Sequence, residues 1–277
     1  MNDGSEDQGA SEDRKELPLE EHATPMNIEI ASVEESDDGK LMDLSFDCRK
    51  GVRIRAYFME PRAPAPWPAV LMVHPAPGDR SYFLAEGWRL AREGIASLLL
   101  DAPWSDPAWG PSLAAPEDAI RAVTVSFRKV QRGIELLATL DDVDHDRMGY
   151  LGMSLGALIG GIVVTIDHRL KAAVLMSGVG SFTDVASLNV PEMSGEALDR
   201  YRSIMAAIDP QTYIGKAAPT QLLFQYGNRD VFPREKLVAF AEAGSEPKKI
   251  IEYDAEHYLN DQARDDAIAW LVDALKQ

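Results

Sequence analysis

Gly152-Met153-Ser154-Leu155-Gly156 lies between an apolar stretch, Met148 to Leu151, that predicts a buried strand and a second stretch, Leu155 to Ile166, that predicts a helix. A strand that turns directly into a helix leaves little room for side chains, so glycine is favoured two positions before and two positions after the serine. The serine hydroxyl is then exposed, and backbone N–H groups at the start of the helix point towards it. The pattern predicts a nucleophile at Ser154. The competing interpretation is a small-residue turn with a solvent-facing serine.

The predicted helix after Ser154 is apolar almost all round, which is typical of a helix that is buried on most sides. Gly156 and Gly160 recur at a spacing of four residues, with Gly161 beside them. We expect these small residues to let the helix backbone approach a sheet closely.

The composition favours one globular domain in an intracellular setting. The chain has 277 residues, 45% of them hydrophobic, and no Ser/Gly/Pro-rich linker divides it. We expect an α/β domain over residues 25–277 with a short insertion at about residues 178–215. The single cysteine, Cys48, excludes an intrachain disulfide, and its alternating surroundings favour a small core residue. Residues 1–23 lack the apolar segment of a signal peptide and no apolar run could span a bilayer, so we expect a cytoplasmic protein.

The net charge of −17 argues against nucleic acid and anionic membrane surfaces as partners, because both would repel the chain. Part of this charge is local, since residues 1–24 hold eight acidic and two basic residues and few apolar ones. Such a segment cannot offset the entropy of ordering itself, so we expect a disordered acidic tail over residues 1–24.

From Met26 onward, the hydrophobic pattern predicts an α/β fold: a mostly parallel, twisted sheet with antiparallel N-terminal strands and helices on both faces. Three alternating stretches predict antiparallel strands, at residues 28–33, 41–48 and 52–59. Continuous apolar runs, typical of strands buried on both faces, follow at residues 69–73, 95–100, 148–151, 172–176, 221–226 and 249–253. The intervening segments 82–92 and 117–140 predict helices.

A serine nucleophile needs a base, and one of the five histidines is well placed for this role. In a parallel sheet, ligands bind beyond the carboxyl ends of the strands. His257 follows the last predicted strand at that edge, whereas His22 lies in the tail and His145 and His168 lie at the opposite end of the sheet. His74 is at the correct edge, but directly beside Pro75 it is expected to shape its own loop.

The base needs an acidic partner that orients it and stabilises its charged form. Asp230 follows the fifth apolar run, in Gly227-Asn228-Arg229-Asp230, and lies between the nucleophile and the base in chain order. Asp184, after the fourth run, could also reach the histidine. We expect Asp230 to be the acid, with Asp184 as the competitor.

With these motifs in place, residues 40–277 resemble an α/β-hydrolase fold serine hydrolase. The resemblance is carried by Val73-His74-Pro75-Ala76-Pro77-Gly78, the Gly152–Gly156 elbow, the Gly227–Asp230 turn and His257. The short insertion and the leading strands resemble the dienelactone-hydrolase-like and acyl-peptidase-like carboxylesterases. Dienelactone hydrolases have cysteine at the nucleophile position, where this chain has Ser154. The resemblance also implies an oxyanion hole formed by the backbone N–H groups of Ala76 and Leu155.

These features predict a serine carboxylesterase that hydrolyses a small soluble ester through an acyl-enzyme intermediate. A peptidase or thioesterase with the same residues is the alternative, and a non-catalytic binding protein of this fold is a further one. We expect no cofactor and no metal, since no metal-ligating cluster or phosphate-binding loop occurs in the sequence. Aromatic residues near the predicted edge could wall the pocket: Trp104, Trp109, Tyr82, Phe83 and Tyr258.

Overall fold

The computed structural model describes residues 25–189 and 193–276. The acidic tail expected at residues 1–24 lies outside these described residues. No helix in the described ranges is long and apolar enough to cross a membrane.

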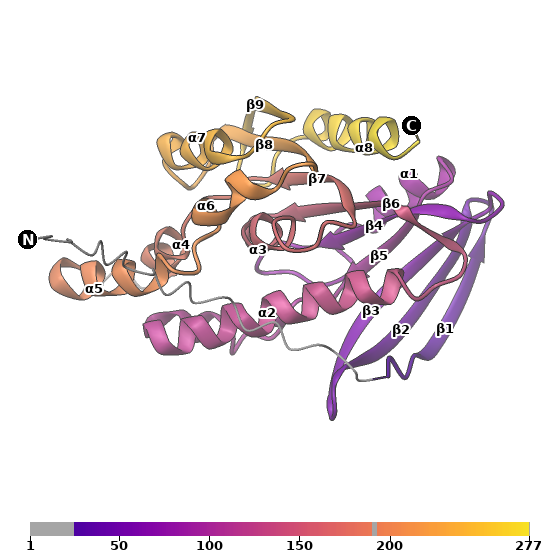
Figure 1. The fold of residues 1–277 in the computed structure, drawn as a ribbon, viewed down its shortest axis with the longest axis horizontal. Helices are drawn as coiled ribbons and strands as arrows, with labels where there is room; N and C mark the ends of the chain where they lie inside the picture. The colour runs from indigo at the N-terminus through magenta and orange to yellow at the C-terminus, as the bar shows by residue number, and fades with distance from the viewer. Residues whose placement is uncertain (1–24, 190–192, 277) are drawn as a thin grey trace, which may run out of the picture.

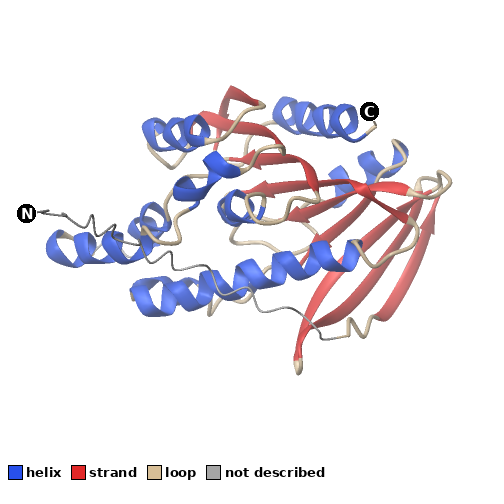
Figure 2. Ribbon diagram, in the orientation of Figure 1, coloured by secondary structure: helices blue, strands red, loops and turns tan. Residues whose placement is uncertain are grey.

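The centre of the fold is a nine-stranded sheet in the order β1-β2-β3-β5-β4-β6-β7-β8-β9 (Figures 1 and 2). The first three strands form the predicted antiparallel meander: β1 (Glu29–Ser36), β2 (Gly39–Arg49) and β3 (Val52–Pro61). β3 pairs antiparallel with β5, and from β5 onward all neighbouring strands are parallel. These strands are β4 (Trp67–Val73), β5 (Ala96–Leu100), β6 (Val143–Met153), β7 (Leu170–Met176), β8 (Gln221–Arg229) and β9 (Lys248–Glu256). The predicted fold class is therefore confirmed.

Helices cover both faces of the sheet, as the continuous apolar strands predicted. The run at residues 249–253 is the exception: β9 is the edge strand and most of its residues are not buried, so its expected burial on both faces was wrong. On one face, α1 (Leu84–Arg92) and α8 (Asp261–Leu275) bury Leu90, Ile268 and Leu271. The other face packs against α2 (Pro116–Leu137), α3 (Leu155–Val163) and α7 (Arg234–Ala243). Cys48 is buried in the core on this second face, as expected.

The strand before the elbow is longer than predicted. The sequence predicted a strand over Met148 to Leu151, but β6 begins at Val143, whose side chain is buried and which pairs with Trp67 of β4. Polar residues occupy most of this extension, so hydrophobicity alone does not reveal it. At the other end of the motif, α3 ends at Val163, and residues up to Ile166 continue only as turns.

The elbow itself requires its glycines. Ser154 has φ 53° and ψ −116°, a conformation in which neighbouring backbone segments come very close. A Cβ atom on Gly152 would lie 2.4 Å from the carbonyl oxygen of Gly156, and one on Gly156 would lie 2.1 Å from the carbonyl oxygen of Val73. The hydroxyl of Tyr150 donates a hydrogen bond of 2.6 Å to the Gly156 carbonyl. These contacts hold the first turn of α3 against the ends of β4 and β6.

We expect Gly156→Ala to lower the free energy of unfolding by about 3 kcal/mol or more, because overpacking against a backbone carbonyl cannot be relieved by a rotamer change. Chemical denaturation would measure this loss. Gly110→Ala is the matched control, since a Cβ there meets nothing within 4 Å. Equal transition midpoints for the two variants would contradict the close contact.

The insertion expected at residues 178–215 connects β7 to β8 and is helical in its described parts. It contains α4 (Phe182–Asn189), α5 (Gly195–Met205), α6 (Pro210–Tyr213) and the 3₁₀ helix η3 (Ile214–Lys216). The buried Asp209 carboxylate accepts hydrogen bonds of 2.8 Å from the backbone N–H of Phe182 and from the hydroxyl of Ser181. Desolvation raises the pKa of Asp209 to about 6. Asp209 therefore anchors the start of α4.

Because the folded-state pKa of Asp209 is raised, the folded protein binds this proton more tightly than the unfolded chain, and stability is lost as the pH rises from about 4 to about 6. A difference of about two pKa units corresponds to ~3 kcal/mol. Between pH 4 and pH 7, we expect the unfolding free energy of wild type minus that of Asp209→Asn to fall by about this amount. Urea titrations at several pH values would measure it.

Candidate active site

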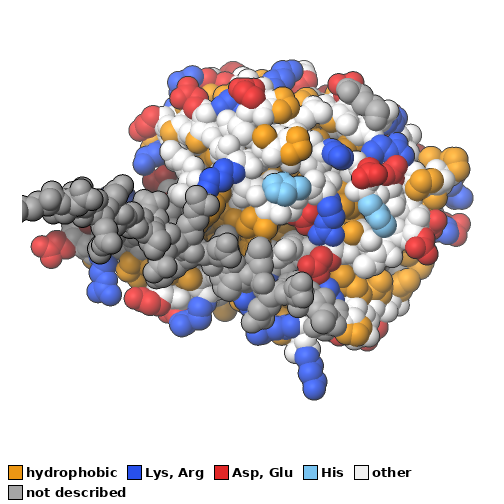
Figure 3. Space-filling view, viewed as in Figure 1, with side chains coloured by type: hydrophobic (Ala, Val, Ile, Leu, Met, Phe, Trp, Pro, Cys, Tyr) orange, Lys and Arg blue, Asp and Glu red, His pale blue; other side chains and the backbone are white. Residues whose placement is uncertain are grey.

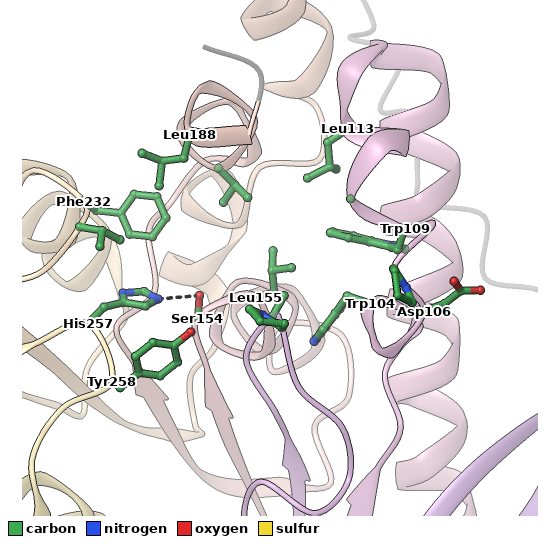
Figure 4. A pocket seen from close by; sticks show the side chains of 16 residues that line it. Trp104, Asp106, Trp109, Leu113, Ser154, Leu155, Leu188, Phe232, His257 and Tyr258 are labelled. Carbon is green, nitrogen blue, oxygen red and sulfur yellow. Dashed lines mark hydrogen bonds between the residues drawn. The ribbon is translucent and has the colours of Figure 1, made fainter.

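Three residues that are far apart in the sequence meet at the carboxyl edge of the parallel strands. Ser154 follows β6, Asp230 follows β8 and His257 follows β9. The central position of β6 brings Ser154 to the middle of this edge, with His257 on one side of it (Figure 4).

The three side chains form a continuous chain of hydrogen bonds. His257 Nε2 lies 2.9 Å from Ser154 Oγ, and His257 Nδ1 lies 2.8 Å from Asp230 Oδ1. The Asp230 side chain is 1% exposed, and its Oδ1 also accepts a hydrogen bond of 3.0 Å from the backbone N–H of Phe232. A buried carboxylate at Nδ1 favours the tautomer in which Nε2 can accept the serine proton. The arrangement can therefore activate the Ser154 hydroxyl.

The environment of His257 restrains its ring. Phe232 and Tyr258 pack edge-on against the imidazole, with ring centroids 5.6 Å and 5.5 Å away. Together with the carboxylate of Asp230, these contacts fix the direction of Nε2 towards Ser154.

Asp184, the competing acid, lies elsewhere. It belongs to the first turn of α4, and its carboxylate forms an ion pair of 3.2 Å with Lys236 of α7. The structure thus brings Asp230, and not Asp184, to His257. The Lys236 partner comes from a distant segment, so no local pattern in the sequence reveals it.

His74 shapes its own loop, as its position beside Pro75 predicted. Its Nδ1 lies 2.7 Å from the carbonyl oxygen of Pro75, and its Nε2 accepts a hydrogen bond of 3.1 Å from the backbone N–H of Ala102. Burial lowers the pKa of His74, which keeps the ring neutral. A neutral ring can donate from Nδ1 and accept at Nε2, as these two hydrogen bonds require. Its carbonyl oxygen accepts a hydrogen bond of 3.1 Å from Trp104 Nε1.

A cavity of about 400 Å³ opens above Ser154 and His257 (Figure 4). Ala76 and Leu155, the expected oxyanion residues, both line it beside Ser154. Its walls are mainly apolar side chains from three segments of the chain: Trp104, Trp109, Leu113, Val185, Leu188 and Phe232.

The sequence identified only some of these wall residues. Trp104, Trp109 and Tyr258 do line the cavity, but Tyr82 and Phe83 do not. Phe83 is buried in the core on the sheet face covered by α1 and α8. The Tyr82 hydroxyl donates a hydrogen bond to the sulfur of Met153 and accepts one from Arg264. Leu188 and Phe232 were missed because their segments reach the cavity only through the tertiary packing of α4 and of the turn after β8.

Within residues 25–189 and 193–276, no group of three or more His, Cys, Asp or Glu side chains is arranged to hold a metal ion.

Comparisons with known proteins agree with this fold. An uncharacterized protein of Mycobacterium tuberculosis is 27% identical over 214 residues, covering 76% of this chain and 69% of that protein. The Bacillus subtilis protein named "Putative hydrolase YtaP" is 29% identical over 173 residues, covering 54% of this chain and 56% of that protein. No family model matches the chain.

Among solved structures, acetyl xylan esterase 1 from Thermoanaerobacterium sp. JW/SL YS485 superposes with a TM-score of 0.77 at 16% sequence identity, covering 91% of this chain and 89% of that one. The sheet order, the strand-to-helix elbow at Ser154 and this superposition show the same fold. The chain has the α/β-hydrolase fold, so the resemblance predicted from the sequence is confirmed at the level of the fold.

The geometry predicts that a fluorophosphonate probe labels Ser154 and that labelling is lost in Ser154→Ala. Asp230→Asn should slow labelling by ~10³-fold, because the histidine loses its orientation and the stabilisation of its charged form. Asp184→Asn is the matched control and should label at the wild-type rate. Mass spectrometry of the modified peptide and gel fluorescence over time would measure both. A slow Asp184→Asn beside a fast Asp230→Asn would assign the acid to Asp184.

Proposed function

We propose that this protein is a serine carboxylesterase that hydrolyses a small soluble ester through an acyl-enzyme intermediate. The observation that carries the proposal is the hydrogen-bonded chain of Ser154, His257 and Asp230 at the base of an apolar cavity. Such an arrangement provides a nucleophile, its base and the group that orients the base.

In the first half of the reaction, His257 Nε2 takes the proton of Ser154 as Oγ attacks the ester carbonyl carbon. The carbonyl π electrons move onto oxygen, which becomes an oxyanion. When this collapses, the bond to the alcohol oxygen breaks, and His257 gives its proton to that oxygen as the alcohol leaves. Water then attacks the acyl-serine by the same route, releasing the carboxylic acid and restoring Ser154.

We assign the oxyanion hole to the backbone N–H groups of Ala76 and Leu155. Both residues line the cavity beside Ser154, and Leu155 is the first residue of α3, where N–H groups have no partner within the helix. The neighbouring Pro75 and Pro77 have no N–H, so Ala76 carries the donor of that segment. Donors fixed in place before the reaction stabilise the developing charge without reorganisation.

An ester is the substrate class that this site suits. The structural neighbour described above is an acetyl xylan esterase, which supports ester hydrolysis on this fold. The cavity is largely apolar, which suits the uncharged acyl and alcohol parts of a small ester. Thioesters and aminoacyl amides would use the same three residues, so they are the comparison substrates.

We expect Ser154→Ala to lower ester turnover by ~10⁴-fold or more while the fold is retained, because the three residues act as a unit. A panel of p-nitrophenyl esters, acyl thioesters and aminoacyl amides would measure turnover, with circular dichroism as the control for folding. A variant that keeps more than about a tenth of the wild-type rate would overturn the assignment of Ser154. If the wild type prefers thioesters or amides, the assignment of Ser154, His257 and Asp230 stands but the proposed substrate class is wrong.

A further inference from the structure

The side chains that line the cavity differ in solvent exposure on the two sides of Ser154. On the side away from His257, Trp104 and Leu113 are 5% and 1% exposed, and Trp109 is half-buried beside them (Figure 4). On the side of His257, Leu188 and Val231 are 52% and 60% exposed although both line the cavity. The end away from His257 is therefore closed by the buried side chains of Trp104 and Leu113, with the exposed residues Asp106 and Pro107 at its rim. The His257 end opens to solvent at Leu188 and Val231, beside the buried Phe232.

The position of His257 decides which part of an ester lies at each end. This step rests on the proposed function. His257 Nε2, 2.9 Å from Ser154 Oγ, has to reach the oxygen of the leaving alcohol to protonate it. The alcohol must then lie on the His257 side of the reacting carbon, and the acyl chain must extend to the opposite side.

We infer that the closed end, formed by Trp104, Trp109 and Leu113, is the acyl pocket and limits acyl length, whereas the open end beside Val231 and Leu188 accepts alcohols of different size. The enzyme is thus selective for short, uncharged acyl groups and tolerant of the alcohol. Trp109 is the residue that sets this limit.

The closed end is held rigidly, as a size limit requires. Trp104 Nε1 donates to the carbonyl oxygen of His74, and its ring packs edge-on against Trp109 with centroids 5.5 Å apart. Trp104 is thereby tied to the loop that carries Ala76. The Trp109 side chain packs against the core and edge-on against Trp104, but its Nε1 has no hydrogen-bond partner among the described residues. Replacing Trp109 therefore breaks no hydrogen bond of the loop.

The charges around the cavity agree with an uncharged acyl group. None of the described side chains that line it is Lys or Arg, and the one carboxylate besides the catalytic groups is Asp106, at the exposed rim. A carboxylate on the acyl chain would enter an apolar pocket without a partner, which is costly.

The acyl series tests the assignment of the closed end. We would measure kcat/KM for p-nitrophenyl acetate, butyrate, hexanoate and octanoate, so that only the acyl part changes. In the wild type, we expect a decline towards octanoate. Trp109→Ala should raise the octanoate-to-acetate ratio of kcat/KM by about 10-fold or more, the scale on which pockets discriminate methylene groups. Trp109→Phe, a smaller change that retains an aromatic ring, should give an intermediate ratio and replaces Trp109→Ala if that variant does not fold.

The alcohol series tests the open end. With ethyl, butyl and benzyl acetates, measured by acid release, we expect wild-type kcat/KM values within about fivefold of each other, since the alcohol meets few fixed contacts. Val231→Ala removes one of these few contacts, so it should change the benzyl-to-ethyl ratio of kcat/KM by no more than about threefold and leave the acyl ratio within about twofold. Ile250→Ala is the matched control, because Ile250 is an exposed apolar residue of β9 outside the cavity, and it should change neither series.

Two results would overturn the inference while the esterase proposal stands. The first is an octanoate-to-acetate ratio of kcat/KM that shifts in Val231→Ala but not in the Trp109 variants. The second is a wild type whose kcat/KM for octanoate equals its kcat/KM for acetate. Absence of Ser154-dependent hydrolysis of every ester in both series would instead overturn the proposed function, and this inference with it.

Discussion

The close approach of α3 to the end of β4 is the contact on which the rest of the site depends. The α-carbon of Gly156 packs so tightly against the Val73 carbonyl that a Cβ would lie 2.1 Å from the oxygen. This contact places the N-terminus of α3, with Leu155, beside the segment after β4, which carries Ala76. It thereby brings both proposed oxyanion donors to Ser154. A catalytic site assembled from backbone groups needs this kind of fixed spacing, because backbone donors cannot adjust by changing rotamer.

The sequence predicted the parts of the fold that depend on local pattern. Strands buried on both faces appear as continuous apolar runs, and an elbow requires glycine at fixed positions, so both can be recognised without coordinates. Asp230 and His257 were also identifiable, because residues that follow parallel strands share one edge of the sheet. The extension of β6 to Val143 was not predicted, since its residues are largely polar and form a strand only because Trp67 of β4 pairs there.

The features that the sequence did not reveal arise from contacts between distant segments. Lys236 of α7 forms an ion pair with Asp184, the competing acid, yet the two positions are 52 apart in the sequence. Tyr82 and Phe83 lie shortly after the segment that carries Ala76, but Phe83 packs in the core and the ring of Tyr82 lies against Arg264. Proximity in sequence to a site residue therefore does not predict a place in the cavity wall.

The residues that wall the cavity also differ in how far a substitution would disturb the hydrogen bonds around His74. Trp104 donates to the carbonyl of His74, which lies two residues before Ala76. The His74 ring in turn bonds the carbonyl of Pro75 in the same loop and the backbone N–H of Ala102 after β5. A change at Trp104 is therefore transmitted to a proposed oxyanion donor and would alter rate together with specificity. Trp109 touches this network only through an edge-on ring contact, and Leu188 and Val231 lie outside it. Substrate range can thus change at Trp109, Leu188 and Val231 while the catalytic edge, fixed by the elbow and by buried hydrogen bonds, keeps its geometry.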